Sequence, residues 1–256
     1  MRFVAMGDSF TEGVGDELDG GAVRGWADLV AAGLASGLDE SVDYANLAIR
    51  GRLIRPIVDE QLEPALALSP RPDVLAFNGG GNDMMRPGFD RDEIVRLTQR
   101  VVKRTEREGV KLLLQTGADP TDGLPRGEML RSRVTVFTDM LTELEDTYEH
   151  VTFVNNYADE EMRRAGYWAP DRLHLNALGH RRVAARVLTA LGVPTELPSL
   201  EADHQAPTGV LVEARYYATY VLPWIGRRLT RRSSGDGRSA KFADWVRIEP
   251  EAVEKA

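Results

Sequence analysis

Apolar residues follow two alternating patterns along the chain: short continuous runs, and longer segments in which they recur every three or four positions. Short apolar runs are typical of buried β-strands, whereas the longer spacing places apolar side chains on one face of a helix. The runs predict strands at residues 2–6, 42–46, 74–78, 110–115 and 151–155. The spaced segments predict helices at residues 26–38, 54–68, 91–108, 127–149 and 177–191.

This strict alternation decides the fold class. Successive strands separated by helices form a parallel sheet, and right-handed crossovers place the helices on both of its faces. We therefore expect an α/β fold, a three-layer α/β/α sandwich built on a parallel five-stranded sheet. In such a sheet the loops after the strands gather at one edge and hold the ligand. Those loops should carry the chemistry.

Composition narrows the classes of function. The chain has 256 residues, 43% hydrophobic and 28% charged, with no apolar stretch of about 18 residues that would span a bilayer. The net charge of −8 argues against a nucleic-acid partner, because phosphate binding requires a basic face. Cysteine is absent, which excludes disulfides, thiolate metal sites and a cysteine nucleophile. The first residues lack the pattern of a secretory leader, so we expect a cytoplasmic protein without integral membrane association.

The first predicted strand breaks directly into Gly-Asp-Ser, at residues 7–9. At a strand-to-helix turn a serine hydroxyl is exposed, and the next helix N-terminus offers backbone N–H groups to a developing anion. Ser9 is therefore a candidate nucleophile. The alternative is that Ser9 only caps the helix.

A serine nucleophile needs a base, and the chain has four histidines. His174 lies three residues after Asp171, so in one tight turn the carboxylate can accept from one ring nitrogen while the other faces the nucleophile. Asp171 would hold the tautomer and stabilise the imidazolium. We interpret the remaining three histidines as ordinary surface or core residues; they are His150, His180 and His204.

Two other loops offer donors for an oxyanion. Asn82 follows an apolar strand and three glycines, which let the backbone approach a ligand and leave the side-chain amide projecting into the cleft. Gly51, after the second strand, offers an unobstructed backbone N–H. The alternative in each case is an ordinary turn. The histidines show no zinc-type spacing, so no metal or other cofactor is predicted.

Four stretches, GDSFTEG, NLAIRG, GGND and DRLHLNALGH, stand in this order at strand ends and before the last helix. In them the chain resembles the SGNH hydrolases, also called GDSL esterases and lipases, over about residues 1–193. The resemblance implies a flavodoxin-like sandwich and a hydrolase domain of that extent. Asp8 and Asp83 match the motifs as loop residues that form hydrogen bonds.

The resemblance also assigns roles to the candidate residues. It implies that Ser9 is the nucleophile, His174 the base and Asp171 the residue that orients the base. It further implies an oxyanion hole formed by the backbone N–H groups of Ser9 and Gly51 together with the side chain of Asn82.

These residues predict a metal-free serine hydrolase that cleaves a carboxylic ester through an acyl-enzyme on Ser9. A small-acyl esterase or deacetylase acting on a small-molecule ester is the first expectation, because no leader points to secretion. The alternatives are an acyltransferase, thioesterase or lysophospholipase using the same site; the intact motifs disfavour a scaffold without activity. Pocket walls are expected from residues 10–15, 50–54, 84–89 and 167–170.

Residues 194–256 form a predicted C-terminal extension of linker, apolar helical arm and basic loop. The arm, residues 210–232, is expected to be a helix interrupted near Pro223. Its aromatic residues predict docking on its own domain or on a second subunit, as in a homodimer. A membrane surface is the alternative, with Trp224 and the arginines at residues 227–232 as anchors. The glycine- and serine-rich stretch at residues 231–240 is expected to be a flexible loop.

Overall fold

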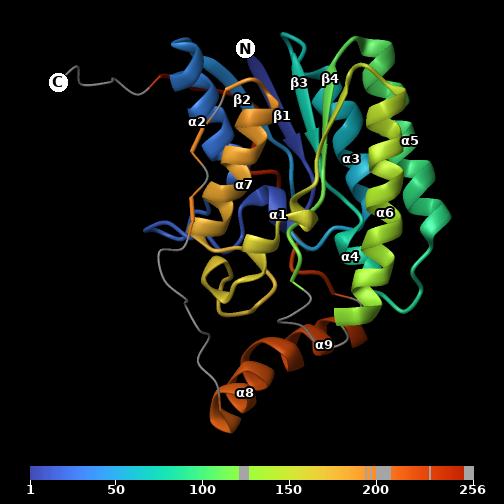
Figure 1. Cartoon of the computed structure of the whole chain (residues 1–256), viewed down its shortest axis with the longest axis vertical. Helices are drawn as coiled ribbons and strands as arrows, with labels where there is room; N and C mark the ends of the chain where they lie inside the picture. Colours follow the sequence, from blue (N-terminus) through green and yellow to red (C-terminus); the bar gives the residue numbers. More distant parts are fainter. Residues whose placement is uncertain (121–126, 194, 197, 200–208, 231, 251–256) are drawn as a thin grey trace.

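A computed structural model describes residues 1–120, 127–193, 195–196, 198–199, 209–230 and 232–250. It contains a six-stranded sheet with the strand order β5-β4-β3-β1-β2-β6 (Figure 1). The first five strands are parallel, and β6 is antiparallel to β2. The strands are β1 (Arg2–Met6), β2 (Val42–Asn46), β3 (Val74–Phe77), β4 (Lys111–Gln115), β5 (Val151–Val154) and β6 (Phe242–Ile248).

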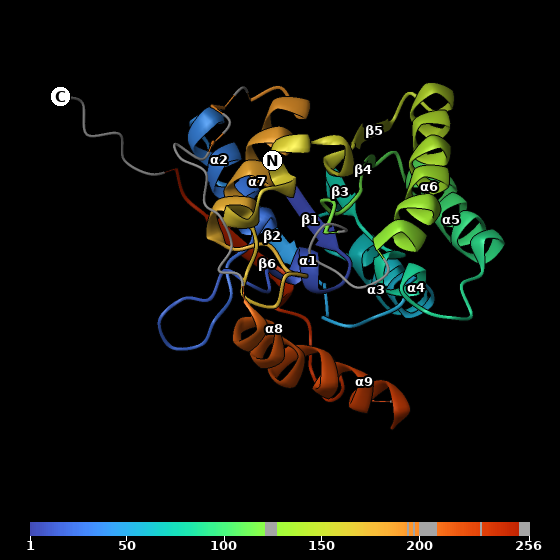
Figure 2. The same ribbon diagram turned by 60° about the horizontal axis from the view of Figure 1, so that its bottom comes forward.

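Helices cover both faces of the sheet, as Figures 1 and 2 show. One face is covered by α2 (Trp26–Leu38) and α7 (Ala177–Ala190). The other is covered by α3 (Ile54–Ala67), α5 (Arg91–Glu108) and α6 (Gly127–Thr147). This arrangement confirms the predicted three-layer α/β/α sandwich.

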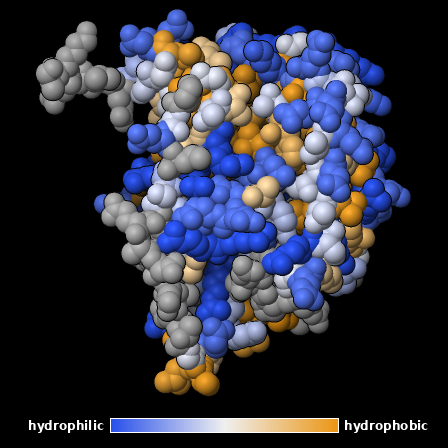
Figure 3. Space-filling view, viewed as in Figure 1, coloured by the Kyte–Doolittle hydropathy of each residue, from blue (hydrophilic) through white to orange (hydrophobic). Residues whose placement is uncertain are grey.

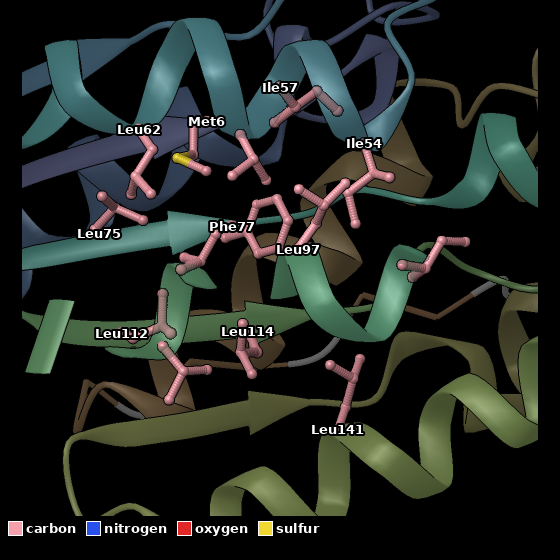
Figure 4. Packing of buried hydrophobic residues seen from close by; sticks show 14 of the residues in the cluster. Met6, Ile54, Ile57, Leu62, Leu75, Phe77, Leu97, Leu112, Leu114 and Leu141 are labelled. Carbon is pink, nitrogen blue, oxygen red and sulfur yellow. The ribbon is translucent and has the colours of Figure 1, made fainter. Parts of the chain in front are cut away.

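Side chains alternate between two apolar clusters because successive residues of a strand point to opposite faces. In β1, Val4 and Met6 join the cluster under α3, α5 and α6, whereas Phe3 and Ala5 join the cluster under α2 and α7. Figure 4 shows part of the first cluster, with strand residues packed against helix residues. The residues that it labels are Met6, Ile54, Ile57, Leu62, Leu75, Phe77, Leu97, Leu112, Leu114 and Leu141.

The predicted strands and helices agree with the structure to within two residues at their ends. Sequence analysis gave no bounds for the short elements at the loop edge of the sheet, although it expected a helix to begin after Ser9. These are the helices α1 (Ser9–Glu12) and α4 (Gly81–Met84), and the 3₁₀ turns η2 (Asn156–Ala158), η3 (Glu160–Arg163) and η4 (Ala165–Tyr167).

The sheet has one strand more than the five predicted, and that strand comes from the C-terminal extension. In β6, Ile248 lies opposite Val42 and Phe242 lies opposite Asn46. The Phe242 ring packs edge-on against the Tyr44 ring, with 5.9 Å between their centroids. A boundary at residue 193 therefore leaves the edge strand of the sheet inside the extension.

The arm is the helix α8 (Val210–Tyr216), the π-helical segment η5 (Tyr217–Val221) and the helix α9 (Leu222–Leu229). The irregular segment lies before Pro223, where a proline removes the N–H that would bond to the carbonyl four residues earlier. Both ribbon views place the arm at the end of the sheet where α1 and α4 lie. Figure 3 shows hydrophobic side chains gathered at the tip of α8. Much of the predicted linker, residues 194, 197 and 200–208, lies outside the described residues.

No described helix has the length and apolar character needed to cross a bilayer.

Candidate active site

A cavity of about 130 Å³ opens at the carboxyl edge of the parallel strands. Three of the predicted site residues, Ser9, Asn82 and His174, line it. They come from the loops after β1, after β3 and before α7, which are far apart in sequence. The topology of the sheet thus brings them together.

The loop that carries Ser9 is tightly fixed. Gly7 donates its N–H to Gln61 Oε1 at 2.8 Å and accepts from Gln61 Nε2 at 3.0 Å. The N-cap of α1 is Asp8, whose carboxylate accepts from the Phe10 N–H at 3.1 Å. Ser9 is the first residue of α1, so the alternative that Ser9 caps this helix is wrong. Ser9 lines the cavity at the N-terminus of this short helix.

Asp171 and His174 form the contact that their spacing predicts. His174 Nδ1 lies 2.6 Å from Asp171 Oδ2, and the backbone N–H groups of Leu173 and His174 both donate to Asp171 Oδ1 at 3.0 Å. Between them Arg172 adopts a left-handed conformation, with φ of 58°, which makes the turn tight. Burial opposes ionisation of Asp171, but these hydrogen bonds and the charge of His174 outweigh it and lower the pKa of the carboxyl.

Because the Asp171 carboxylate accepts the hydrogen bond, the proton of the neutral His174 ring lies on Nδ1. The other ring nitrogen, Nε2, is then free to act as a base. Within the described residues no hydrogen bond joins Ser9 Oγ to His174 Nε2. Such bonds are often long in the absence of substrate and shorten when it binds.

Asn82 links two loops at the cavity. Its Nδ2 donates to Asp8 Oδ2 and to the Arg52 carbonyl oxygen, at 3.0 Å each. Both N–H bonds of the amide are engaged, so an oxyanion can bind Asn82 only when one of them is shared or released. Gly51 itself does not line the cavity, but the adjacent Arg52 is bonded to Asn82 and places this turn beside it.

Two aspartates of the motifs hold these loops in place. Burial raises the pKa of Asp8 to about 6, against the lowering effect of its hydrogen bonds and of His174. Burial also raises the pKa of Asp83 to about 6, and Asp83 Oδ2 accepts from the Ile54 N–H at 2.9 Å. Both aspartates thus form loop hydrogen bonds, as the motif match predicts.

The other described histidines lie in structural positions. His180 is fully buried, accepts from the Trp26 N–H at Nδ1 and contacts the Val14 carbonyl at Nε2, each at 3.2 Å. His150 Nε2 lies 3.2 Å from Thr105 Oγ1. His204 lies outside the described residues.

The walls of the cavity differ partly from the prediction. Phe10, Val14, Met84, Met85 and Trp168 lie in the predicted wall segments and line it, whereas residues 50–54 do not. The predicted wall segments left out one face of α6 and several residues of the loops after the strands. Among these wall residues are Leu130, Val134, Phe137, Thr116, Ala118 and Tyr157.

The α6 residues recur at helical spacing, and that spacing is the same for a helix face packed on the core and for one that lines a pocket. The stripe alone therefore carries no signal of a binding function.

In the described part of the chain, no three His, Asp or Glu side chains gather in a way that could hold a metal ion.

The order of these motifs on this sheet is that of a known family of ester hydrolases. The sequence model of the GDSL-like lipase/acylhydrolase family matches residues 5–182, and the chain belongs to this family.

Individual relatives are distant. The chain is 26% identical to an uncharacterised Bacillus subtilis (strain 168) protein, YpmR, over 75% of this chain and 83% of that protein. The psychrotrophic esterase EstA from a Pseudoalteromonas species superposes with a TM-score of 0.57 at 16% identity, covering 75% and 96% of the two chains. Axe2, an acetylxylan esterase from Geobacillus stearothermophilus, superposes with a TM-score of 0.60 at 21% identity, covering 75% and 94%. These two likenesses show a shared fold.

Proposed function

We propose that the protein is a serine esterase that hydrolyses a small carboxylic ester through an acyl-enzyme on Ser9. The observation that carries the proposal is that His174, joined to Asp171 at 2.6 Å, lines the same cavity as Ser9. A nucleophile, a base with an orienting carboxylate, and nearby amide donors are the groups that acyl transfer requires.

In the proposed reaction His174 Nε2 takes the proton of Ser9 as Oγ attacks the ester carbonyl carbon. Asp171 stabilises the imidazolium that forms. The negative charge on the carbonyl oxygen is bound by the N–H groups of Ser9 and Gly51 and by the amide of Asn82. His174 then returns the proton to the leaving alcohol, and water hydrolyses the acyl-enzyme by the same steps in reverse.

The cavity supports a short apolar acyl group. Its lining is mostly apolar and includes Met84, Leu130, Val134 and Phe137. An apolar cavity of about 150 Å³ holds a molecule the size of benzene. A cavity of about 130 Å³ therefore suits an acyl group of about six carbons or fewer. Acyl transfer to an alcohol and hydrolysis of a thioester use the same groups and remain the alternative functions.

The test is hydrolysis of p-nitrophenyl esters of increasing acyl length by the wild type and by Ser9→Ala. We expect the rate to be highest at or below about six carbons and to fall beyond that length. Ser9→Ala should lower kcat by about 10³-fold or more without changing the melting temperature, since the hydroxyl acts as one member of a catalytic unit. The matched control is Ser132→Ala, because Ser132 is exposed and, among the described residues, its hydroxyl bonds only to the Met129 carbonyl of its own helix.

Labelling by a fluorophosphonate provides a second measurement. The probe should modify the wild type at Ser9 and leave Ser9→Ala unlabelled. EstA was itself crystallised in a form inhibited by monoethylphosphonate. Equal turnover in the wild type and Ser9→Ala would disprove the mechanism. An added alcohol that outcompetes water for the acyl-enzyme would favour the acyltransferase instead.

A further inference from the structure

The segment that precedes β6 lies against the loop that carries Gly51. Because β6 runs antiparallel to β2, with Phe242 opposite Asn46, the residues before β6 pass beyond the carboxyl end of β2. The loop after β2, which carries Gly51, also lies beyond this end of the strand, so the two segments are neighbours. Ser233 Oγ donates to the Gly51 carbonyl oxygen at 3.1 Å, a contact between residues 182 positions apart. This segment lies beyond residue 182, where the match to the family ends.

The two backbones meet without room for a side chain between them. A Cβ on Gly51 would lie 2.5 Å from Ser233 Oγ and 2.7 Å from Ser234 Oγ. A Cβ on Gly235 would lie 2.2 Å from the Arg50 carbonyl oxygen. Gly51 also has a φ of +74°, in the left-handed region that favours glycine. The close approach therefore requires glycine on both sides of the contact.

Residues 233–236, the 233–236 loop, are shaped by their own hydrogen bonds. The Ser233 N–H donates to Asp236 Oδ2 at 2.8 Å, and the Gly235 N–H donates to Ser233 Oγ at 3.2 Å. The second bond occupies a lone pair of the hydroxyl, which directs its proton to Gly51. Lys241 anchors the following residues, with Nζ 2.8 Å from Asp28 Oδ2 on α2. The predicted flexible loop is thus held to the body of the protein.

The turn at Gly51 is held from a second direction by α1. Glu12 accepts from the Arg50 N–H at 2.6 Å and from Arg50 Nε at 2.8 Å. The Arg50 carbonyl and the Gly51 N–H belong to one planar trans peptide and point in opposite directions. Contact of Gly235 with the Arg50 oxygen therefore fixes the direction of the Gly51 N–H. Within the described residues that N–H has no acceptor.

We propose, on the basis of the proposed function, that the 233–236 loop positions the oxyanion hole. Its contacts with the Arg50–Gly51 peptide hold the Gly51 N–H toward the reacting carbonyl oxygen. Ser233 and Gly235 are positioning residues that act through Gly51 and do not touch the substrate. The C-terminal extension is in this way part of the catalytic apparatus.

The test compares Ser233→Ala and Gly235→Ala with the wild type on p-nitrophenyl butyrate. Removal of a whole oxyanion donor costs about 10²–10³ in kcat, so loss of its support in Ser233→Ala should lower kcat about 10-fold. Gly235→Ala must displace the Arg50 carbonyl and should lower kcat about 10²-fold, because a shift of about 1 Å in a reacting group has that effect. KM should stay within about twofold in both, since donors to the oxyanion act mainly in the transition state.

Two control variants match these changes. Ser132→Ala removes an exposed hydroxyl on α6, and Gly226→Ala adds a methyl group in α9 where nothing lies within 4 Å of the new Cβ. Both should keep the wild-type kcat. Hydrogen–deuterium exchange gives a readout independent of turnover: exchange should rise in a peptide covering residues 47–53 in Ser233→Ala and Gly235→Ala, and not in the controls.

The outcomes separate this proposal from the proposed function. If Ser9→Ala is inactive while Ser233→Ala and Gly235→Ala keep the wild-type kcat, or change only KM, the esterase assignment stands and the positioning role is overturned. If the wild type hydrolyses no faster than Ser9→Ala, the proposed function fails. Unchanged exchange at residues 47–53 in both variants overturns the contact itself, whether or not the protein is active.

Discussion

His180 is a buried histidine that ties α7 to the N-terminus of α2 through the Trp26 N–H. Burial lowers its pKa from 6.5 to about 4, so its ring is neutral in the folded protein at neutral pH. Between those values the unfolded chain binds more protons than the folded one, and stability is lost as the pH falls from about 6.5 to about 4.

The lowered pKa of His180 predicts that the free energy of unfolding falls by about 3 kcal/mol as the pH drops from about 6.5 to below about 4. We expect His180→Gln to be less stable than the wild type at pH 7, with the difference shrinking as the pH is lowered. Urea unfolding at several pH values measures this. Parallel pH dependence in the two proteins would show that His180 titrates normally.

Asn82 combines a structural role in this site with a proposed chemical one. Its amide bridges Asp8 and the Arg52 carbonyl, so the same group that is proposed to bind the oxyanion also joins two loops. Asn82→Ala should lower kcat by about 10²–10³-fold, the usual effect of losing one donor to the oxyanion. Steady-state kinetics measures it. Asn155→Ala is the control, because Asn155 caps the η2 turn outside the cavity. An effect confined to KM would assign Asn82 to substrate binding alone.

At the scale of elements, the sequence predicted the central fold because its strands and helices are strongly periodic and lie between clear turn residues. Three of the motif loops were found because each combines polar residues with glycine after a strand, and the fourth because His174 lies three residues after Asp171. Strand β6 was missed since it lies at an edge: FADWVRI mixes charged and apolar residues, with neither face fully buried. The contact of Ser233 with Gly51 was also unpredictable, because it depends on where β6 returns the chain.

The arm is attached to the catalytic loop by one turn of α8. The Arg172 guanidinium lies over the Tyr216 ring, 4.1 Å from its centroid, and pairs with Glu213 at 2.6 Å. Tyr216 is buried, whereas the Arg172–Glu213 pair is partly exposed to water. An exposed ion pair contributes at most about 1 kcal/mol, whereas a buried aromatic ring contributes more.

The attachment of α8 should therefore depend on Tyr216 more than on Glu213. We expect Tyr216→Ala to speed tryptic cleavage within residues 209–230 several-fold, and Glu213→Gln to change it little. Limited proteolysis with mass analysis measures both rates, and Leu38→Ala is the control because Leu38 is exposed at the end of α2, away from the arm. Equal rates in all three variants would show that packing of the Tyr216 ring does not hold the arm.

For the whole molecule, the C-terminal extension leaves the sheet through α7 and returns to it as β6. The arm lies between these two points, so a chain ending before residue 209 would lose β6 and the 233–236 loop together with the arm. The role of the arm must therefore be tested by substitutions on its surface. Its fold and its attachment to Arg172 are then preserved.

The arm exposes an apolar surface that its contact with Arg172 leaves uncovered. Val210 and Leu211 are 86% and 84% exposed, and Leu222 is 60% exposed. Large apolar side chains exposed together on one element often mark an interaction surface. A net charge of −8 disfavours an anionic lipid surface, which attracts only the basic residues near the arm. A second copy of the chain has the same apolar surface, and we therefore expect a homodimer through the arm.

Light scattering after size exclusion should give about twice the chain mass of 28.3 kDa for the wild type at micromolar concentration. The double variant Leu211→Asp, Leu222→Asp should run at the single-chain mass with its esterase rate unchanged, because charge in an apolar interface is costly and neither residue lines the cavity. Leu38→Asp is the control, an exposed leucine at the end of α2 away from the arm. A monomeric wild type that floats with anionic vesicles, while the double variant does not, would assign the arm to a membrane surface instead.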